Sequence, residues 1–202
     1  MIYLIDDCSS RENAEFVIDT FRNADLNCIF LRNLENKGPG YSRNLGIENS
    51  YNKYIYFIDA DDYFLDYRVL ERSYFQIENN NMNYLYIRKR DPYDEENSTI
   101  KDFLVKRDFI EKNNIKYGEF YRNEDSYFNE LLKFYSNNNI DNSYTNFIGS
   151  YYRRNSENNT SNRLNRKEKL FSHILERYCF FNRIASEKTD YTSDWVKKIF
   201  LT

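Results

Sequence analysis

Cysteine, glycine, proline and histidine are all scarce in this chain of 202 residues, which contains three, five, two and one of them respectively. The cysteines, Cys8, Cys28 and Cys179, are odd in number and widely spaced, which argues against a disulfide framework and against a zinc site. The one histidine, His173, lies in a helical apolar pattern, where a surface or packed role is more common than metal binding.

Long apolar runs and an excess of one charge are also missing. No run is long enough to span a bilayer, and no basic stretch followed by an apolar one opens the chain. We therefore expect a cytoplasmic protein without a transmembrane segment. Lysine and arginine total 29 against 32 acidic residues, so no overall field favours a nucleic-acid partner.

Aromatic residues, in contrast, are plentiful, with 20 tyrosines and 16 phenylalanines. They supply enough bulky side chains for a globular protein, although the mean hydropathy is −0.87. The length suits one compact α/β domain with a small helical appendage.

Strand and helix signals alternate along the first half of the chain. Short apolar runs predict strands at residues 2–5, 28–31, 54–58 and 83–88. Helical periodicity appears between them, at residues 14–21, 40–49 and 66–79. This alternation is typical of βαβ units and predicts a mostly parallel sheet flanked by helices.

The second half of the chain is less regular. Residues 103–105 form a short apolar stretch, residues 107–113 read as a helix, and a further helix opens at residues 123–132. Residues 144–152 look like a strand, after which a basic loop and helical segments follow. We expect one domain over residues 1–152, with residues 153–202 packed on it.

Residues 58–62, Ile-Asp-Ala-Asp-Asp, follow the apolar run 54–57 directly. Acids at the end of a strand lie at the carboxyl edge of a sheet, where open α/β folds bind ligands and where Mg²⁺ or Mn²⁺ could bridge a diphosphate. Such acids also begin loops or cap helices without binding anything.

Two further motifs precede the acidic one. Residues 6–9 read Asp-Asp-Cys-Ser, and residues 36–47 read Asn-Lys-Gly-Pro-Gly-Tyr-Ser-Arg-Asn-Leu-Gly-Ile. Together with Phe-Ile-Asp-Ala-Asp-Asp at residues 57–62, this ordered set resembles the family 2 glycosyltransferases of the GT-A fold. The resemblance implies inverting, metal-dependent transfer of a sugar from a nucleotide-diphosphate donor, a UDP-sugar, to an acceptor hydroxyl of a glycan or another molecule.

The resemblance also assigns roles around the donor. Asp61 would hold Mn²⁺ or Mg²⁺ against the diphosphate, and Asp59 would face the ribose or the metal's waters. Asp7 matches the acid that contacts the nucleotide, or else is a loop acid after a strand. Lys37 and Arg43 flank a Gly-Pro-Gly turn at a helix start, a place suited to an anion, although either could be solvated.

The Glu-Asp pair at residues 124–125 matches the motif whose second acid is the base. Asp125 would then take the acceptor proton, although acids in the first turn of a helix stabilise it in any case. Arg153 or Arg154, in a basic loop after the strand at 144–152, would close over the diphosphate or remain solvated.

The chain departs from the family pattern at its start. In the family a strand and a helix precede the Asp-Asp strand, and here we expect both to be missing. A non-catalytic GT-A remnant that serves as a binding module is therefore the main alternative.

A response-regulator receiver, with Asp6, Asp7 and Asp59 around Mg²⁺, is a weaker alternative. A receiver has no use for the Gly-Pro-Gly helix start, and the chain shows no late Lys-Pro pair. Basic residues beside bulky apolar ones near the C-terminus would suit a membrane surface or partner, although packing on the domain explains them better.

Overall fold

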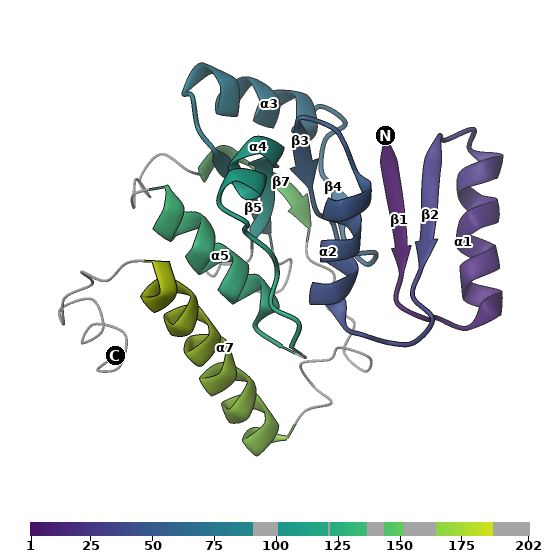
Figure 1. Cartoon of the computed structure of the whole chain (residues 1–202). Coiled ribbons are helices and arrows are strands. Elements are labelled where there is room, and N and C mark those ends of the chain that lie inside the picture. The colour runs from purple at the N-terminus through teal and green to yellow at the C-terminus, as the bar shows by residue number, and fades with distance from the viewer. Residues whose placement is uncertain (91–100, 121, 137–143, 152–164, 188–202) are drawn as a thin grey trace.

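A computed structural model of the chain describes residues 1–90, 101–120, 122–136, 144–151 and 165–187 (Figure 1). Within these residues, seven strands form two sheets, one of two strands and one of five. The predicted segments 153–164 and 193–200, with Arg153 and Arg154, lie outside the described residues.

The larger sheet has the strand order β3-β6-β5-β7-β4. Its strands are β3 (Tyr54–Tyr56), β6 (Lys101–Lys106), β5 (Tyr84–Arg90), β7 (Tyr144–Tyr151) and β4 (Tyr63–Phe64). Only β5 and β7 are parallel neighbours, and the other three pairs are antiparallel. The expectation of a mostly parallel sheet is therefore wrong for this sheet.

The reason lies in the connection between β5 and β6. A parallel pair needs a crossover of a dozen or more residues, usually with a helix. Residues 91–100 are too few for one, and β6 returns antiparallel to β5 with Leu85 opposite Leu104. Local periodicity shows that residues 103–105 are apolar but says nothing about the direction in which they pair.

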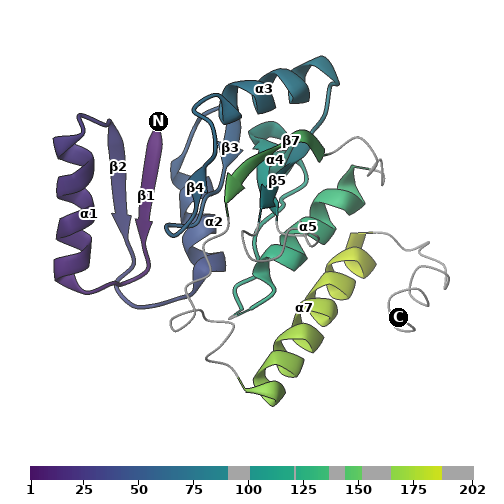
Figure 2. The same cartoon turned by 180° about the vertical axis from the view of Figure 1, so that it is seen from behind.

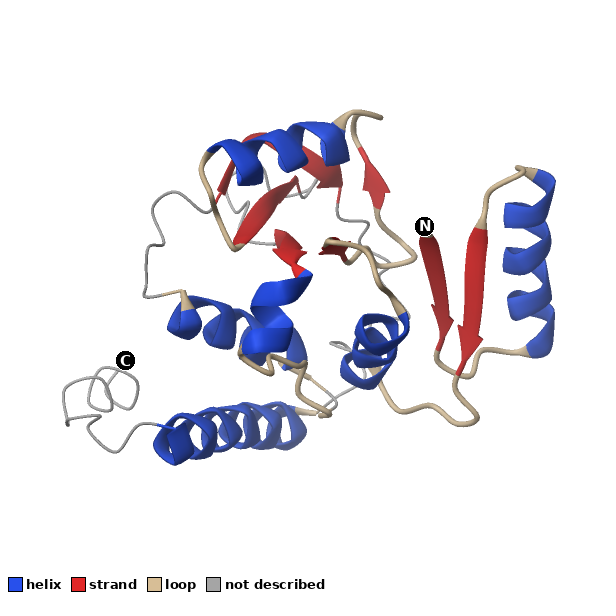
Figure 3. Cartoon of the chain, turned by 45° about the horizontal axis from the view of Figure 1, so that its top comes forward, coloured by secondary structure: helices blue, strands red, loops and turns tan. Residues whose placement is uncertain are grey.

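Helix α3 (Val69–Asn79) covers one face of the larger sheet (Figure 3). On that face Val69 and Ile77 pack with apolar residues of the strands, Leu85, Ile87 and Leu104. Each large apolar side chain that is removed from water contributes about 1.5–3 kcal/mol, so this small cluster fixes α3 firmly.

The opposite face carries an aromatic core beneath α4 (Arg107–Lys112) and α5 (Glu124–Tyr135). Phe128 of α5 is fully buried and stacks on Tyr117 with ring centroids 4.0 Å apart. Phe57 and Phe103 meet the Phe128 ring edge-on. Aromatic side chains thus fill the space between the sheet and α5.

Helix α7 (Arg166–Glu187) runs along α5 on the outside of this core (Figure 1). Phe180 and Ile184 of α7 are buried in the aromatic core, and Arg183 donates to the carbonyl oxygen of Asn113 at 3.0 Å. No helix of the described segments is both long and apolar enough to cross a lipid bilayer.

The smaller sheet pairs β1 (Ile2–Asp6) in parallel with β2 (Cys28–Arg32), and α1 (Arg11–Asn23) connects the two strands. None of the residues of β1 and β2 is buried, and Ala14 is the buried residue of α1. Helix α2 (Pro39–Asn49) lies between this unit and the rest of the molecule (Figure 2).

Candidate functional site

Helix α2 begins where the second sequence motif places it. Gly38 has φ +85°, a left-handed conformation that glycine adopts without strain, and Pro39 follows at the first helical position. The carboxylate of Asp7 accepts hydrogen bonds from the backbone N–H groups of Lys37 (2.9 Å) and Gly38 (2.8 Å). It also accepts one from the side chain of the buried Asn33, at 2.8 Å.

Asp7 therefore fastens the end of β1 to the start of α2. This arrangement places Asp7 beside the Gly-Pro-Gly turn, as a nucleotide-contacting acid would be, and also gives it a structural role. Lys37 lies next to it with its ammonium over the ring of Tyr41, 4.5 Å from the centroid. Contact of Asp7 and Lys37 with a nucleotide stays a prediction.

Arg43, just over one turn into α2, joins two acidic motifs that are far apart in the sequence. Its guanidinium donates to Asp59 and to Glu124, each at 2.8 Å, and lies over the ring of Tyr117. Both ends of the guanidinium are therefore occupied by protein carboxylates. The geometry gives Arg43 a bridging position, and its predicted contact with an anion is untested.

Two contacts of α2 hold the loop before α5 against this arginine. The side-chain amide of Asn44 donates to the carbonyl oxygen of Tyr117 at 3.0 Å and accepts from its N–H at 2.8 Å. Gly40 lies so close to Gly118 that a Cβ atom would come 2.1 Å from its carbonyl oxygen. Gly40 and Asn44 belong to the second sequence motif, but the sequence does not indicate that they contact Gly118 and Tyr117.

The predicted metal motif forms an acidic cluster. Ligand oxygens of Asp59, Asp61 and Asp62 all lie within 4.8 Å of one another. Asp59 is bound to Arg43, and Asp62 forms an ion pair with Lys89. Across the described residues the Asp61 carboxylate has no hydrogen bond or ion pair, so it is the acid best placed to bind a cation. Hard carboxylate oxygens of this kind fit Mg²⁺ and Mn²⁺.

A network of buried groups lies behind Asp62. Lys89 of β5 is 3% exposed and also pairs with Asp102 of β6 at 2.7 Å. The same Asp102 carboxylate accepts hydrogen bonds from the hydroxyls of Tyr56 (2.6 Å) and Ser150 (2.7 Å). The sequence analysis did not identify Lys89. The feature that could have indicated it is its position two residues after Ile87, in the alternating row of apolar residues of β5.

The pKa values of the two acids that bind Arg43 are shifted in opposite directions. Burial works against ionisation of Asp59, but the charge and hydrogen bond of Arg43 outweigh it and hold the Asp59 pKa below its ordinary value. Burial and the charge of Asp125 raise the pKa of Glu124, against the effect of Arg43. Asp59 is therefore the more strongly ionised partner of the arginine.

Asp125 occupies the first turn of α5, directly after Glu124. Asn123 precedes the helix in a left-handed conformation, with φ 66°. Glu124 turns inward to Arg43, while the Asp125 side chain is exposed and accepts from the N–H of Ser126 at 2.8 Å. Of the two acids, Asp125 is thus the one that a substrate can reach.

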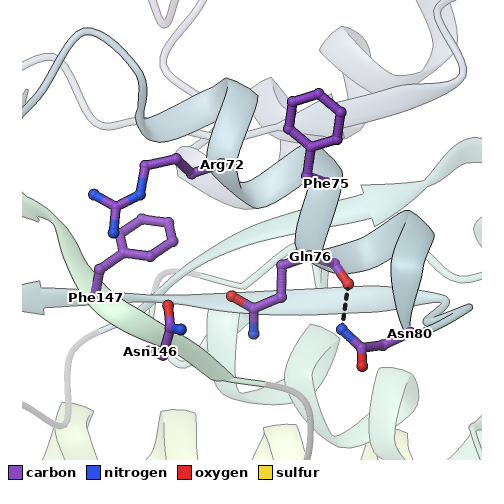
Figure 4. A pocket seen from close by; sticks show the side chains of 6 residues that line it. All are labelled: Arg72, Phe75, Gln76, Asn80, Asn146 and Phe147. Carbon is purple, nitrogen blue, oxygen red and sulfur yellow. Dashed lines mark hydrogen bonds between the residues drawn. The ribbon is translucent and has the colours of Figure 1, made fainter.

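A pocket of about 400 Å³ lies elsewhere, between α3 and β7 (Figure 4). Arg72 lies over the ring of Phe147 at 4.0 Å, and Gln76 donates to the carbonyl oxygen of Tyr144 at 2.7 Å. None of its lining residues belongs to the predicted site, so this pocket is separate from the acidic cluster.

The fold matches solved GT-A glycosyltransferases. The mannosyltransferase PcManGT from Pyrobaculum calidifontis, in complex with GDP-Man and Mn²⁺, aligns with a TM-score of 0.63 at 11% identity, covering 98% of this chain and 68% of that one. TarS residues 1–349 from S. aureus, in complex with UDP, align with a TM-score of 0.60 at 20% identity, covering 74% and 50%.

The sequence then defines the family. The profile of glycosyl transferase family 2 matches residues 1–129, and the chain belongs to that family. The uncharacterized glycosyltransferase MJ1057 of Methanocaldococcus jannaschii is 33% identical over 100 residues, which are 50% of this chain and 34% of that protein. The chain thus spans about a third of this relative. The resemblance drawn from the three motifs is confirmed.

Proposed function

We propose that this chain transfers a sugar from a nucleotide-diphosphate donor to an acceptor hydroxyl, with inversion and with the help of Mn²⁺ or Mg²⁺. The observation that carries this proposal is the bridge that Arg43 makes between Asp59 and Glu124. Asp61 lies two residues after Asp59, and Asp125 directly follows Glu124, so this bridge joins the two segments that carry the candidate metal ligand and the candidate base.

The chemistry needs a base on one side of the sugar and charge neutralisation on the other. Asp125 takes the proton of the acceptor hydroxyl as its oxygen forms a bond to the anomeric carbon. The bond from that carbon to the diphosphate breaks, and the diphosphate leaves with the electron pair. Asp61 with Asp59 would hold a divalent cation, which would neutralise charge on the leaving diphosphate.

The donor we propose is a UDP-sugar. The ligands of the structural neighbours, UDP in TarS and GDP-Man with Mn²⁺ in PcManGT, support a nucleotide-sugar donor and a metal. A screen of UDP- and GDP-sugars with Mn²⁺, scored by released nucleotide, tests the proposal. A parent protein that binds nucleotide but never turns over would favour the binding-module alternative.

Asp61→Asn tests the metal. The substitution keeps the side-chain volume and removes a charged ligand, so metal-dependent binding of UDP should be lost while the fold is retained. Calorimetry with and without Mn²⁺ measures this, with Asp19→Asn on the exposed face of α1 as the matched control. Unchanged affinity in Mn²⁺ would remove Asp61 from the site.

Asp125→Asn tests the base. The amide keeps the shape but accepts no proton, so transfer to the acceptor should fall by roughly 10² to 10⁴ while donor binding hardly changes. Single-turnover transfer and donor calorimetry separate the two effects. Near-normal transfer would reduce Asp125 to an acid that stabilises the start of α5.

We propose a peripheral location on the cytoplasmic side of a membrane. All three cysteines are free, and α7 exposes Leu170, Ile174 and Tyr178 in a row, each more than half exposed, beside the basic residues Lys167 and Arg177. Co-sedimentation with anionic but not zwitterionic vesicles, weakened by Ile174→Ser, is expected. Equal recovery in the supernatant with both vesicles would contradict the membrane contact.

A further inference from the structure

Lys89 occupies a position at which an apolar residue is expected. Along β5 the side chains of Leu85 and Ile87 point to the α3 face and are 0% exposed, and Lys89 continues that row. Lysine is almost never buried unless a carboxylate pairs with it. Burying its ammonium group costs desolvation free energy, which only a well-placed partner offsets.

The sheet is shaped to give Lys89 its surroundings. The pairing of β5 with β7 is irregular. Arg88 lies opposite Ile148, but the next residue of β5, Lys89, lies opposite Ser150. The residue skipped on β7 is Gly149, where a Cβ atom would come 2.3 Å from Ile87. This irregularity aims Ser150 at Asp102, so that three strands meet around the lysine.

The lysine reaches from this network to the candidate metal loop. Its ammonium binds Asp102 inside the sheet and Asp62 in the loop between β3 and β4. The N–H of Asp62 donates to the carbonyl oxygen of Asp59 at 3.0 Å, which closes a turn around Asp61. Fixing the Asp62 side chain therefore fixes the turn that presents Asp61.

We propose that Lys89 is a positioning residue, which holds Asp62 against the sheet so that Asp59 and Asp61 face a divalent cation. That Lys89 holds the loop does not depend on the transfer reaction, whereas the binding of a cation by this loop rests on the proposed function. Asp62 then acts as the anchored end of the loop, with one carboxylate oxygen bound to Lys89.

The change in Mn²⁺ affinity on removing the Lys89 charge shows whether Lys89 holds the loop or acts only through its charge. The Lys89 ammonium binds Asp62, whose carboxylate lies within 4.8 Å of those of Asp59 and Asp61. The positive charge of Lys89 therefore repels a cation bound to these acids. Removing that charge should tighten Mn²⁺ binding if Lys89 acts through charge alone. It should weaken binding if Lys89 holds the ligands in place.

Lys89→Met is the test, because methionine keeps the length of the side chain and removes its charge. Tyr56 and Ser150 still donate to Asp102 in this variant, which limits the damage to the sheet. Hydrogen exchange, followed without any ligand, should be at least about tenfold faster in residues 57–66 and unchanged in residues 2–6. Lys53→Met, on an exposed lysine, is the matched control.

Mn²⁺ titration of the same variant should show about 10- to 100-fold weaker binding, the usual effect of losing a group that orients a metal ligand. Lys89→Arg, which retains a cation and its donors, should restore part of the affinity. If Lys89→Met does not fold, the double variant Lys89→Met, Asp102→Asn removes both the lysine and the aspartate charge from the sheet, and the same results are expected of it.

Unchanged exchange in residues 57–66, or Mn²⁺ binding as tight as in the parent protein or tighter, would overturn the role of Lys89. A parent protein that binds no Mn²⁺ would instead count against the proposed metal site. In that case the exchange measurement alone decides whether Lys89 holds the loop.

Discussion

The two sheets of the molecule differ in what stabilises them. The five-stranded sheet is covered on both faces, and its central strand β5 has four consecutive buried residues from Tyr84 to Ile87. The pair β1 and β2 has no buried residue, and Asp7, directly after β1, accepts hydrogen bonds from the start of α2. One region is held by apolar packing, and the other by a polar joint.

The candidate site lies where these regions meet. Helix α2 binds Asp7 at its first residues and Asp59 and Glu124 through Arg43. A rigid core thus carries Asp61 and Asp125, while the less packed unit supplies Asp7. The candidate site therefore joins a densely packed part of the molecule to a part with few buried residues, and regions with few buried contacts open more readily.

The same truncation in each sheet should produce the largest contrast. Leu85→Ala removes a fully buried side chain from β5 and should lower the free energy of unfolding by about 2–5 kcal/mol. Leu4→Ala, in β1, removes a half-buried side chain and should cost about 1 kcal/mol. Urea denaturation measures both, and equal losses would show that the smaller sheet is packed as tightly as the larger one.

Asp7→Ala should separate the two regions. It removes the carboxylate that accepts three hydrogen bonds, a loss of roughly 1.5–3 kcal/mol at the contact between β1 and α2. Hydrogen exchange should become faster in residues 2–38 while residues 84–90 keep their protection. The control is Asp19→Ala, at an exposed position of α1, and uniform loss of protection would show that the regions unfold as one.

Glu176→Gln probes a polar group inside the covered region. Glu176 of α7 is 1% exposed, and among the described residues its carboxylate oxygens accept no hydrogen bond, although His173 and Arg177 lie 3.4 and 3.7 Å away. Burial raises the pKa of Glu176, against the charge of Arg177. Because the folded form prefers the protonated acid, this contribution to stability is complete below the unfolded pKa and is lost as pH rises through the folded one.

Replacing Glu176 by glutamine should therefore raise the free energy of unfolding at pH 7 by about 1 kcal/mol and change it little near pH 4. Urea denaturation at the two pH values measures the difference. Glu130 and Asp125 of α5, whose charges also disfavour an ionised Glu176, are present in both proteins. A variant that is less stable at pH 7 would show that the carboxylate has a favourable partner.

Phe16→Ser should have the smallest effect. Phe16 is 72% exposed on α1, so the free energy of unfolding should change by no more than about 0.5 kcal/mol. A thermal or urea transition measures it. A clear loss of stability would mean that α1 packs more closely than its exposed face indicates, and the contrast between the regions would weaken.

Much of the site could be predicted from the sequence because its residues are grouped in short motifs. The acids at 59 and 61 follow a strand, the glycines of 38–40 mark a helix start, and Glu124 and Asp125 open α5. Each motif depends on local geometry, and the structure forms the expected strand end or helix start at all three. Their roles in catalysis stay predictions.

Contacts between distant segments could not be predicted in this way. The direction of β6 depends on its pairing with β5, and the partners of Arg43 come from segments 16 and 81 residues away. The ion pair of Lys89 with Asp62 joins residues 27 apart in the chain. No periodicity within one segment contains this information.

The sequence by itself determined most of the helices and strands and which short motifs carry carboxylates, because backbone preferences and apolar spacing act over a few residues. The tertiary structure alone decided how the strands pair, that Arg43 joins two motifs, and that Lys89 lies under the acidic loop. These features depend on which surfaces can be buried together, and a buried charge is stable only where folding brings its partner to it.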